Sequence, residues 1–383
     1  MKKILILFFL FISIPIVTAQ TYVKDKEKEV TLTEELDETS NELNLTENAK
    51  SAIMIEASTG KIIYEKNADD QSLIASTTKI MTALIVCEQC NVLDRMAIPK
   101  EAVGIEGSSM YLQAGEILTI QELLYGLMLC SGNDAAVALA IYCGGTVEGF
   151  AELMNDKARE LGLQNTHFVN PHGLDAKDHY STARDLAVLA SYAMKNPIFA
   201  QTVSTKQVTV GNRYLTNHNK LLWRIEGADG VKTGYTKAAG RILVSSATRQ
   251  GRRLIAVTIN APDDWNDHKA LLERGFADFS LRQIVAEGEV LGHRHIVGGD
   301  GTAVPLVAAE GFSYALAAGE EIDLVLSPQW FSYAPVRGGA AEGCAYAVLD
   351  GQVVGQIPLV WAFGLEETKE KERTLLKRLF GGN

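Results

Sequence analysis

The fold of this chain is decided by the stretch Ser76-Thr77-Thr78-Lys79-Ile80-Met81-Thr82-Ala83-Leu84-Ile85. Its apolar residues recur at the three- and four-residue spacing of one helical face, which predicts a buried helix. Ser76 and Lys79 are three residues apart, so a helix places them side by side. A serine hydroxyl becomes a nucleophile when a base takes its proton, and a lysine with a lowered pKa can be that base. The stretch therefore predicts a core helix that begins with a catalytic pair.

A second polar motif, Ser131-Gly132-Asn133, follows an apolar helical pattern at residues 123–129. A turn there directs both polar side chains toward one cavity. We expect Ser131 to be catalytic and to pass a proton to the leaving amine. The Asn133 carboxamide offers a donor and an acceptor for a substrate backbone. The alternative for this motif alone is a glycine that ends one helix before the next begins.

A third motif, Lys232-Thr233-Gly234, lies in a strand-like setting. We expect Lys232 and Thr233 to bind a substrate carboxylate, and Gly234 to let substrate and backbone approach closely. Lys232 is also the second cation that would lower the pKa of Lys79. The backbone amides of Ser76 and Tyr235 are predicted to form an oxyanion hole. Taken alone, this motif would be read as an edge strand that ends in a turn.

The order of predicted elements is strands, then helices, then strands. Strands are predicted at residues 52–55, 62–64, 230–233, 241–248 and 254–260, and helices at 120–129, 135–142, 147–161, 183–194 and 273–279. This order predicts an α+β domain at residues 49–279, whose sheet uses both chain ends and is surrounded by helices. Short apolar runs between glycine-rich turns predict a small all-β domain at residues 280–358.

Both ends of the chain carry further signals. Lys2, Lys3, an apolar run at 4–16 and Val17-Thr18-Ala19 predict a signal peptide at residues 1–19, with an uncleaved anchor as the alternative. Residues 20–48 are polar and predict a flexible leader. In the tail, residues 359–383, the stretch 365–380 predicts an amphipathic helix, either a membrane-surface anchor or a solvated helix. We expect an exported protein at the outer face of the cytoplasmic membrane.

Composition narrows the function classes. With 383 residues, 47% of them hydrophobic and 22% charged, the chain is an ordinary globular protein of about two domains. The net charge of −11 argues against nucleic acid as a partner. Cys87 and Cys90 have a zinc-like spacing, but no second cysteine pair completes a site. We expect no metal; the sequence does not specify a disulfide pairing, and Cys130 is interpreted as a small buried residue beneath the site.

The chain resembles the low-molecular-mass penicillin-binding proteins, the serine D-alanyl-D-alanine carboxypeptidases of peptidase family S11. The resemblance extends over about residues 52–279 and includes further segments besides the three motifs. These are Gly107-Ser108-Ser109-Met110-Tyr111-Leu112, Leu124-Tyr125-Gly126-Leu127-Met128-Leu129, Asn133-Asp134-Ala135-Ala136, Asn170-Pro171-His172-Gly173-Leu174-Asp175 and His179-Tyr180-Ser181-Thr182-Ala183. It implies a DD-peptidase/β-lactamase-like catalytic domain, an antiparallel sheet with clustered helices.

The resemblance also implies a reaction. Ser76 would attack the carbonyl between the last two D-alanines of a peptidoglycan stem pentapeptide, and water would hydrolyse the acyl-enzyme. β-Lactam antibiotics would acylate the same serine, and no cofactor is implied. The alternatives are a DD-endopeptidase, a β-lactamase and a non-catalytic peptidoglycan-binding protein on the same scaffold. A β-lactamase needs efficient deacylation, often through an added glutamate base, and no clear Glu-x-x-x-Asn segment lies between Ser131 and Lys232.

Two features outside the motifs need an interpretation. Many relatives place an arginine in the segment that here reads Asp263-Asp264-Trp265-Asn266-Asp267-His268, which has none. Any carboxylate-binding role carried over to that position is therefore not supported by the segment itself, although Arg249, Arg252 and Arg253 are not far away in sequence. His172 and His179 lie near acidic residues but lack a metal-ligand spacing, so we expect them to pack and hydrogen-bond within a loop.

Overall fold

The computed structural model describes residues 46, 48–299, 303–327 and 331–367. The predicted signal peptide, nearly all of the leader and residues 368–380 of the predicted amphipathic helix lie outside these ranges. The first three residues of that predicted helix, 365–367, are described and are not helical, because Leu365 forms an antiparallel β-bridge with Val336.

A five-stranded antiparallel sheet organises residues 46–278, in the order β2-β1-β9-β8-β7. Its strands come from both sides of the helical region, as the sequence predicts: β1 (Ser51–Glu56), β2 (Ile62–Lys66), β7 (Ala228–Thr236), β8 (Gly240–Arg249) and β9 (Arg252–Ile259). β7 is an edge strand, so one of its sides is available to a ligand.

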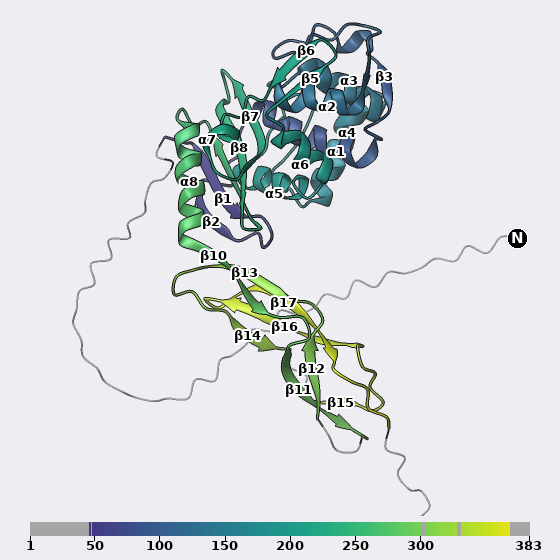
Figure 1. Cartoon of the computed structure of the whole chain (residues 1–383), viewed down its shortest axis with the longest axis vertical. Helices are drawn as coiled ribbons and strands as arrows, with labels where there is room; N and C mark the ends of the chain where they lie inside the picture. The colour runs from purple at the N-terminus through teal and green to yellow at the C-terminus, as the bar shows by residue number, and fades with distance from the viewer. Residues whose placement is uncertain (1–45, 47, 300–302, 328–330, 368–383) are drawn as a thin grey trace, which may run out of the picture. The chain divides into compact units, whose positions relative to one another are not determined.

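Helices cover both faces of this sheet (Figure 1). One face carries the cluster α1 (Lys79–Gln89), α2 (Ile120–Leu129), α3 (Asn133–Gly144), α4 (Val147–Glu160), α5 (Ala183–Ala193) and α6 (Pro197–Ser204). The other face is covered by α7 (Leu221–Arg224) and α8 (Asp264–Asp278). Alternate strand residues divide between the two layers: Ile242 and Val244 join the core under the helix cluster, and Leu243 joins the core under α8.

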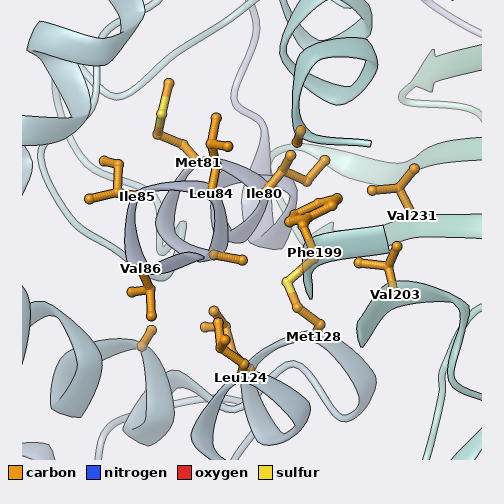
Figure 2. Close-up of a cluster of buried hydrophobic side chains, with 14 of the residues drawn as sticks. Ile80, Met81, Leu84, Ile85, Val86, Leu124, Met128, Phe199, Val203 and Val231 are labelled. Atoms are coloured by element: carbon orange, nitrogen blue, oxygen red, sulfur yellow. The ribbon is translucent and has the colours of Figure 1, made fainter. Parts of the chain in front are cut away.

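Helix α1 lies at the centre of the larger core. Figure 2 shows its apolar side chains surrounded by those of α2, α6 and β7, including Leu124, Phe199 and Val231. Nine of its eleven residues, Lys79–Cys87, are buried. The helix is therefore surrounded on most sides, which explains why the lysine at its first position has almost no contact with water.

Short elements complete this part of the chain. They are η1 (Ala75–Thr78), β3 (Arg95–Ala97), η2 (Lys100–Ala102), β4 (Ile117–Thr119), β5 (Gln207–Val210) and β6 (Arg213–Thr216). The hairpin β5–β6 and helices α6 and α7 are additions to the predicted elements. Helix α8 begins at Asp264, nine residues before the predicted start at 273, because polar residues fill its first turns and obscure the periodicity. A disulfide joins Cys90 and Cys143.

The C-terminal module is all-β, as predicted. A six-stranded sheet has the order β14-β16-β17-β12-β11-β15, and β10 pairs with β13. The strands are β10 (Phe279–Val285), β11 (Val290–Val297), β12 (Ala303–Ala308), β13 (Phe312–Ala317), β14 (Asp323–Leu326), β15 (Phe331–Tyr333), β16 (Ala341–Leu349) and β17 (Gln352–Trp361). β17 continues past the predicted boundary at residue 358 because Leu359 and Trp361 are core residues of this module.

Among the described helices, one bent pair has the combined length and apolar character of a membrane span. No single helix there has the length and apolar character to cross a bilayer; α3 and α4 reach these limits only together, with an 81° bend between them. Eight of the twelve residues of α3 are buried in the structure.

Candidate active site

Ser76 and Lys79 lie at the start of the central helix. Ser76 is in the 3-10 turn η1, and the α-helix begins at Lys79 itself. Residues three apart are eclipsed in a 3-10 turn, which explains the short distance between the two side chains. The Lys79 Nζ lies 2.9 Å from the Ser76 Oγ. The sequence prediction of a serine–lysine pair is therefore matched in the structure, although a 3-10 turn rather than an α-helix sets its geometry.

The Lys79 ammonium group is enclosed. Its Nζ donates to the Asn133 Oδ1 at 2.7 Å and to the His172 backbone oxygen at 2.6 Å, in addition to Ser76. The side chain is fully buried. Burial, followed by the charge of Lys232, lowers the pKa of Lys79 well below its ordinary value of 10.5. Both causes are those that the sequence predicts, and they favour the neutral amine that a base requires.

Asn133 is held by the protein at both ends of its carboxamide. The Oδ1 accepts from Lys79, and the Nδ2 donates to the backbone oxygen of Glu106. The sequence prediction leaves both groups for a substrate, whereas in the structure they connect the base to the loop at residue 106. Asn133 begins α3, and its neighbour Asp134 fixes the same loop.

Asp134 is a site residue that sequence reasoning missed. Its buried carboxylate accepts hydrogen bonds from the backbone amides of Met110, Leu112 and Ala135 and from the Ser109 hydroxyl, at 2.6–3.1 Å. An acid in the first turn of a helix is the signal that could have found it. These contacts hold the segment 109–112 against the start of α3, and so against Asn133.

Ser131 occupies the turn between α2 and α3. Its φ of 62° is the left-handed conformation that the turn requires, and Ser131 adopts it rather than Gly132. Gly132 is needed for space, because a Cβ there would lie 2.7 Å from the Asp134 Oδ1. Ser131 lines the same cavity as Ser76, as the sequence predicts.

Lys232, Thr233 and Gly234 lie on the edge strand β7. Thr233 and Gly234 line the cavity with Ser76, Ser131 and Tyr235. Lys232 is buried, and its Nζ donates to the Thr233 backbone oxygen at 2.8 Å. Burial lowers the pKa of Lys232 to about 7. One residue or more of each predicted motif thus lines the same cleft. Lys79 and Asn133 are linked to it by hydrogen bonds behind Ser76, and Lys232 is buried next to Thr233.

The sequence predicts that Gly234 allows the close approach of a substrate, and in the structure it also allows the close approach of η1. A Cβ at this position would lie 3.2 Å from the Ile74 backbone oxygen and 3.3 Å from both the Ala75 Cβ and the Ser76 backbone nitrogen. The glycine therefore lets β7 approach η1, in addition to any approach by a substrate. This proximity places the amide of Tyr235, the next residue, in the same region as the Ser76 amide.

The two loop histidines make hydrogen bonds to neighbouring groups of the protein. His179 bonds to the Thr78 hydroxyl at 2.8 Å and accepts from the Val169 amide at 3.1 Å. The His172 ring accepts from the Leu174 amide at 3.2 Å. Within the described ranges, no three His, Cys, Asp or Glu side chains are grouped so as to hold a metal ion.

The cleft is a cavity of about 780 Å³. Its described lining combines hydroxyl, amide and aromatic groups and also includes Arg241, Asp264 and Trp265, which the sequence analysis did not assign to the site. Arg249, Arg252 and Arg253, which precede residues 263–268 in sequence, have partners elsewhere: Arg249 pairs with Glu273, Arg253 pairs with Asp229, and Arg252 donates to backbone oxygens at the end of α8.

Comparisons with known proteins agree with this geometry. The family model described as D-alanyl-D-alanine carboxypeptidase matches residues 37–263, and the model of the penicillin-binding protein 5 C-terminal domain matches residues 279–367. The chain is 33% identical to the D-alanyl-D-alanine carboxypeptidase DacF of Bacillus subtilis (strain 168), covering 88% of this chain and 90% of the relative. It is 34% identical to DacC of Escherichia coli (strain K12), covering 84% and 85%.

A solved structure extends the likeness to both parts of the chain. Penicillin-binding protein 5 from Haemophilus influenzae superposes with a TM-score of 0.74 at 30% identity, covering 84% of this chain and 98% of the other. The catalytic fold and the all-β module expected from the sequence are thus confirmed together. The chain belongs to the D-alanyl-D-alanine carboxypeptidases of peptidase family S11, the low-molecular-mass penicillin-binding proteins.

Proposed function

We propose that this protein removes the terminal D-alanine from peptidoglycan pentapeptides through an acyl-enzyme on Ser76, and that penicillins acylate the same oxygen. The observation that carries the proposal is the 2.9 Å contact between the Ser76 Oγ and a buried Lys79 whose pKa is lowered. A neutral amine at this position takes the hydroxyl proton as the oxygen attacks the carbonyl carbon.

Groups of the cleft can account for each bond and proton of the acylation step. The Ser76 Oγ forms a bond to the carbonyl carbon of the penultimate D-alanine, and its proton passes to the Lys79 Nζ. The oxyanion lies between the backbone amides of Ser76 and Tyr235. When the C–N bond breaks, the proton held on the Lys79 Nζ passes through the Ser131 hydroxyl to the leaving amine of the terminal D-alanine, and the lysine is neutral again. Lys79 then takes a proton from the water that attacks the ester carbonyl and gives it to the Ser76 Oγ as the ester bond breaks.

The cleft favours slow release of an acyl group derived from penicillin. Asp264 is the only carboxylate residue among the described lining residues, and its oxygen is already hydrogen-bonded to Arg241 at 2.6 Å. In class A β-lactamases a glutamate carboxylate positions the hydrolytic water. The described lining therefore supports a penicillin-binding carboxypeptidase over a β-lactamase of that class.

Mass spectrometry after brief exposure to benzylpenicillin tests the proposal. We expect one stable adduct on the wild type and on Ser108→Ala, which removes a different hydroxyl from the cleft, and none on Ser76→Ala. The wild type should then release D-alanine from a pentapeptide. Rapid penicillin hydrolysis without an adduct would indicate a β-lactamase instead, and an absence of both adduct and hydrolysis would indicate a binding protein.

We also propose that the protein is exported and attached to the outer face of the cytoplasmic membrane through its C-terminal helix. The support is the sequence pattern at residues 1–19 and the amphipathic stretch 365–380. N-terminal sequencing of the mature protein should begin at Gln20. Deletion of residues 368–383 should move the protein from the membrane fraction to the soluble fraction, and retention at the membrane would count against the anchor.

A further inference from the structure

Arg241 lies in the catalytic cleft, and the reaction described above does not use it. It is the second residue of β8 and pairs with Tyr235 of β7. Residues opposite each other on paired strands share a face, and so do residues two apart on one strand. Arg241, Tyr235 and Thr233 therefore lie on the same face of the sheet. The diagonal from Arg241 to Thr233 is within reach of a long side chain.

The start of α8 holds the guanidinium group in place. The Arg241 Nη2 donates to the Asp264 Oδ1 at 2.6 Å, and the guanidinium carbon lies 5.7 Å from the centre of the Trp265 ring. The Asp264 side chain is 3% exposed, whereas that of Arg241 is 42% exposed. A buried acid thus fixes one side of the arginine while a large part of the side chain faces solvent.

Arg241 has donors to spare. Among the described residues, Asp264 is the only hydrogen-bond acceptor of its side chain, and the shielded Nε has no partner. A guanidinium group has five N–H donors in a planar arrangement that matches a carboxylate. Donors held in place beside a substrate cavity are therefore suited to bind an anionic group of the substrate.

The other cations of the cleft are less suited to this role. Lys232 is buried, it is not among the residues that line the cavity, and its Nζ donates to the Thr233 backbone oxygen. Lys220 directly precedes α7 and also lines the cavity. Its ammonium group cannot form the bidentate contact with a carboxylate that a guanidinium group forms. Of these three side chains, Arg241 is the one that offers a planar guanidinium group to the cavity and is held there by a buried acid.

We propose that Arg241 binds the C-terminal carboxylate of the peptide substrate, together with the Thr233 hydroxyl, and that Asp264 is a positioning residue for it. This inference rests on the proposed carboxypeptidase function. The carboxylate of a penicillin would occupy the same place. The sequence segment that lacks an arginine, residues 263–268, instead supplies the acid that orients an arginine from the neighbouring strand.

A pair of substrates that differ only in the carboxylate tests the assignment. Acyl-D-alanyl-thioglycolate carries a free carboxylate, and its methyl ester does not, while the bond that is cleaved is the same. We expect Arg241→Ala to lower kcat/KM about 10- to 100-fold for the acid and less than about threefold for the ester. Arg241→Gln should behave in the same way and is available if the alanine variant fails to fold. Asp264→Asn should reduce the preference for the acid by about fivefold, without an equal loss on the ester.

Two controls separate the proposal from its rivals. Arg249→Ala removes an arginine from the same strand that is also paired with an acid of α8, but outside the cleft, and should leave both substrates unaffected. An equal loss on both substrates for Arg241→Ala would assign it a structural role and overturn the proposal. A carboxylate-selective loss in Lys220→Ala but not in Arg241→Ala would also overturn it. If the wild type cleaves neither substrate, the proposed function itself fails, which is a separate result.

Discussion

Replacing Asn133 with aspartate should weaken the function of Lys79 as a base at neutral pH without changing the size of the side chain at position 133. In the structure the Asn133 Oδ1 lies 2.7 Å from the Lys79 Nζ in a fully buried setting. A carboxylate there stabilises the protonated amine and so raises the pKa of Lys79. At neutral pH the lysine would then be charged and unable to accept the Ser76 proton.

The magnitude follows from the distance. Two unit charges 2.7 Å apart attract each other by about 6 kcal/mol at an effective dielectric constant of 20. Desolvation of the new carboxylate and its repulsion by the Glu106 oxygen, which now accepts from the Asn133 Nδ2, oppose this attraction. A net effect of about 1.4–4 kcal/mol remains, so we expect acylation at pH 7 to slow by about 10- to 1,000-fold.

The assay is the second-order rate of acylation by a fluorescent penicillin between pH 6 and pH 10. The log rate of Asn133→Asp should rise by about one for each pH unit and approach the wild-type rate at high pH, because the neutral amine is restored there. Asn155→Asp is the matched control. Its half-buried carboxamide bonds to both backbone groups of Phe168, away from the cleft, so any loss of stability should leave the pH profile unchanged. A loss that is equal at all pH values in Asn133→Asp would refute the assignment of Lys79 as the base.

Three further predictions concern the support of the site. Gly173→Ala should prevent folding or abolish acylation, because the new Cβ would lie 1.8 Å from the Ala75 backbone oxygen, beside the nucleophile. Gly104 has a similar positive φ but open space around it, so Gly104→Ala should lower the free energy of unfolding by only about 1 kcal/mol in a thermal unfolding experiment. Asp134→Asn should lower the free energy of unfolding in urea by about 2–4 kcal/mol, because a charged acceptor of buried amides is lost; an unchanged midpoint would contradict this. His268, fully buried with its pKa lowered from 6.5 to about 3, binds a proton in the unfolded chain before the folded one, so its contribution to stability is lost as the pH falls below 6.5. In His268→Gln, the loss of stability between pH 7 and pH 5 should therefore be smaller by about 2 kcal/mol, and an equal loss would show that His268 titrates normally.

The parts of the site that sequence could predict are those fixed by local spacing. Ser76 and Lys79 are neighbours through three residues of one turn, and Ser131 and Asn133 flank one junction between helices. The partners at long sequence separation were not predictable in this way. Asn133 bonds to Glu106, 27 residues away, and Lys79 bonds to the His172 backbone oxygen, 93 residues away. Such contacts depend on how α1, α3 and the loops pack together.

Arg241 shows the same division. Arg241 follows Tyr235 by six residues, across the turn between β7 and β8. The register of that hairpin places the two residues opposite each other. The acid that orients it, Asp264, comes from α8, and its pairing depends on the packing of that helix against the sheet. The strand periodicity alone does not show which arginine of this region faces the cleft.

By itself the sequence determined the serine–lysine pair, the order of the three motifs, the α+β class and the division into a catalytic domain and a β module, because these follow from spacing, periodicity and order along the chain. The tertiary structure decided the state of the side chains. Burial and Lys232 lower the pKa of Lys79, the protein itself occupies the Asn133 carboxamide, and Gly234 brings β7 against η1. The physical reason is that charge state and hydrogen-bond partners depend on distances and exclusion of water, which exist only after distant segments have packed together.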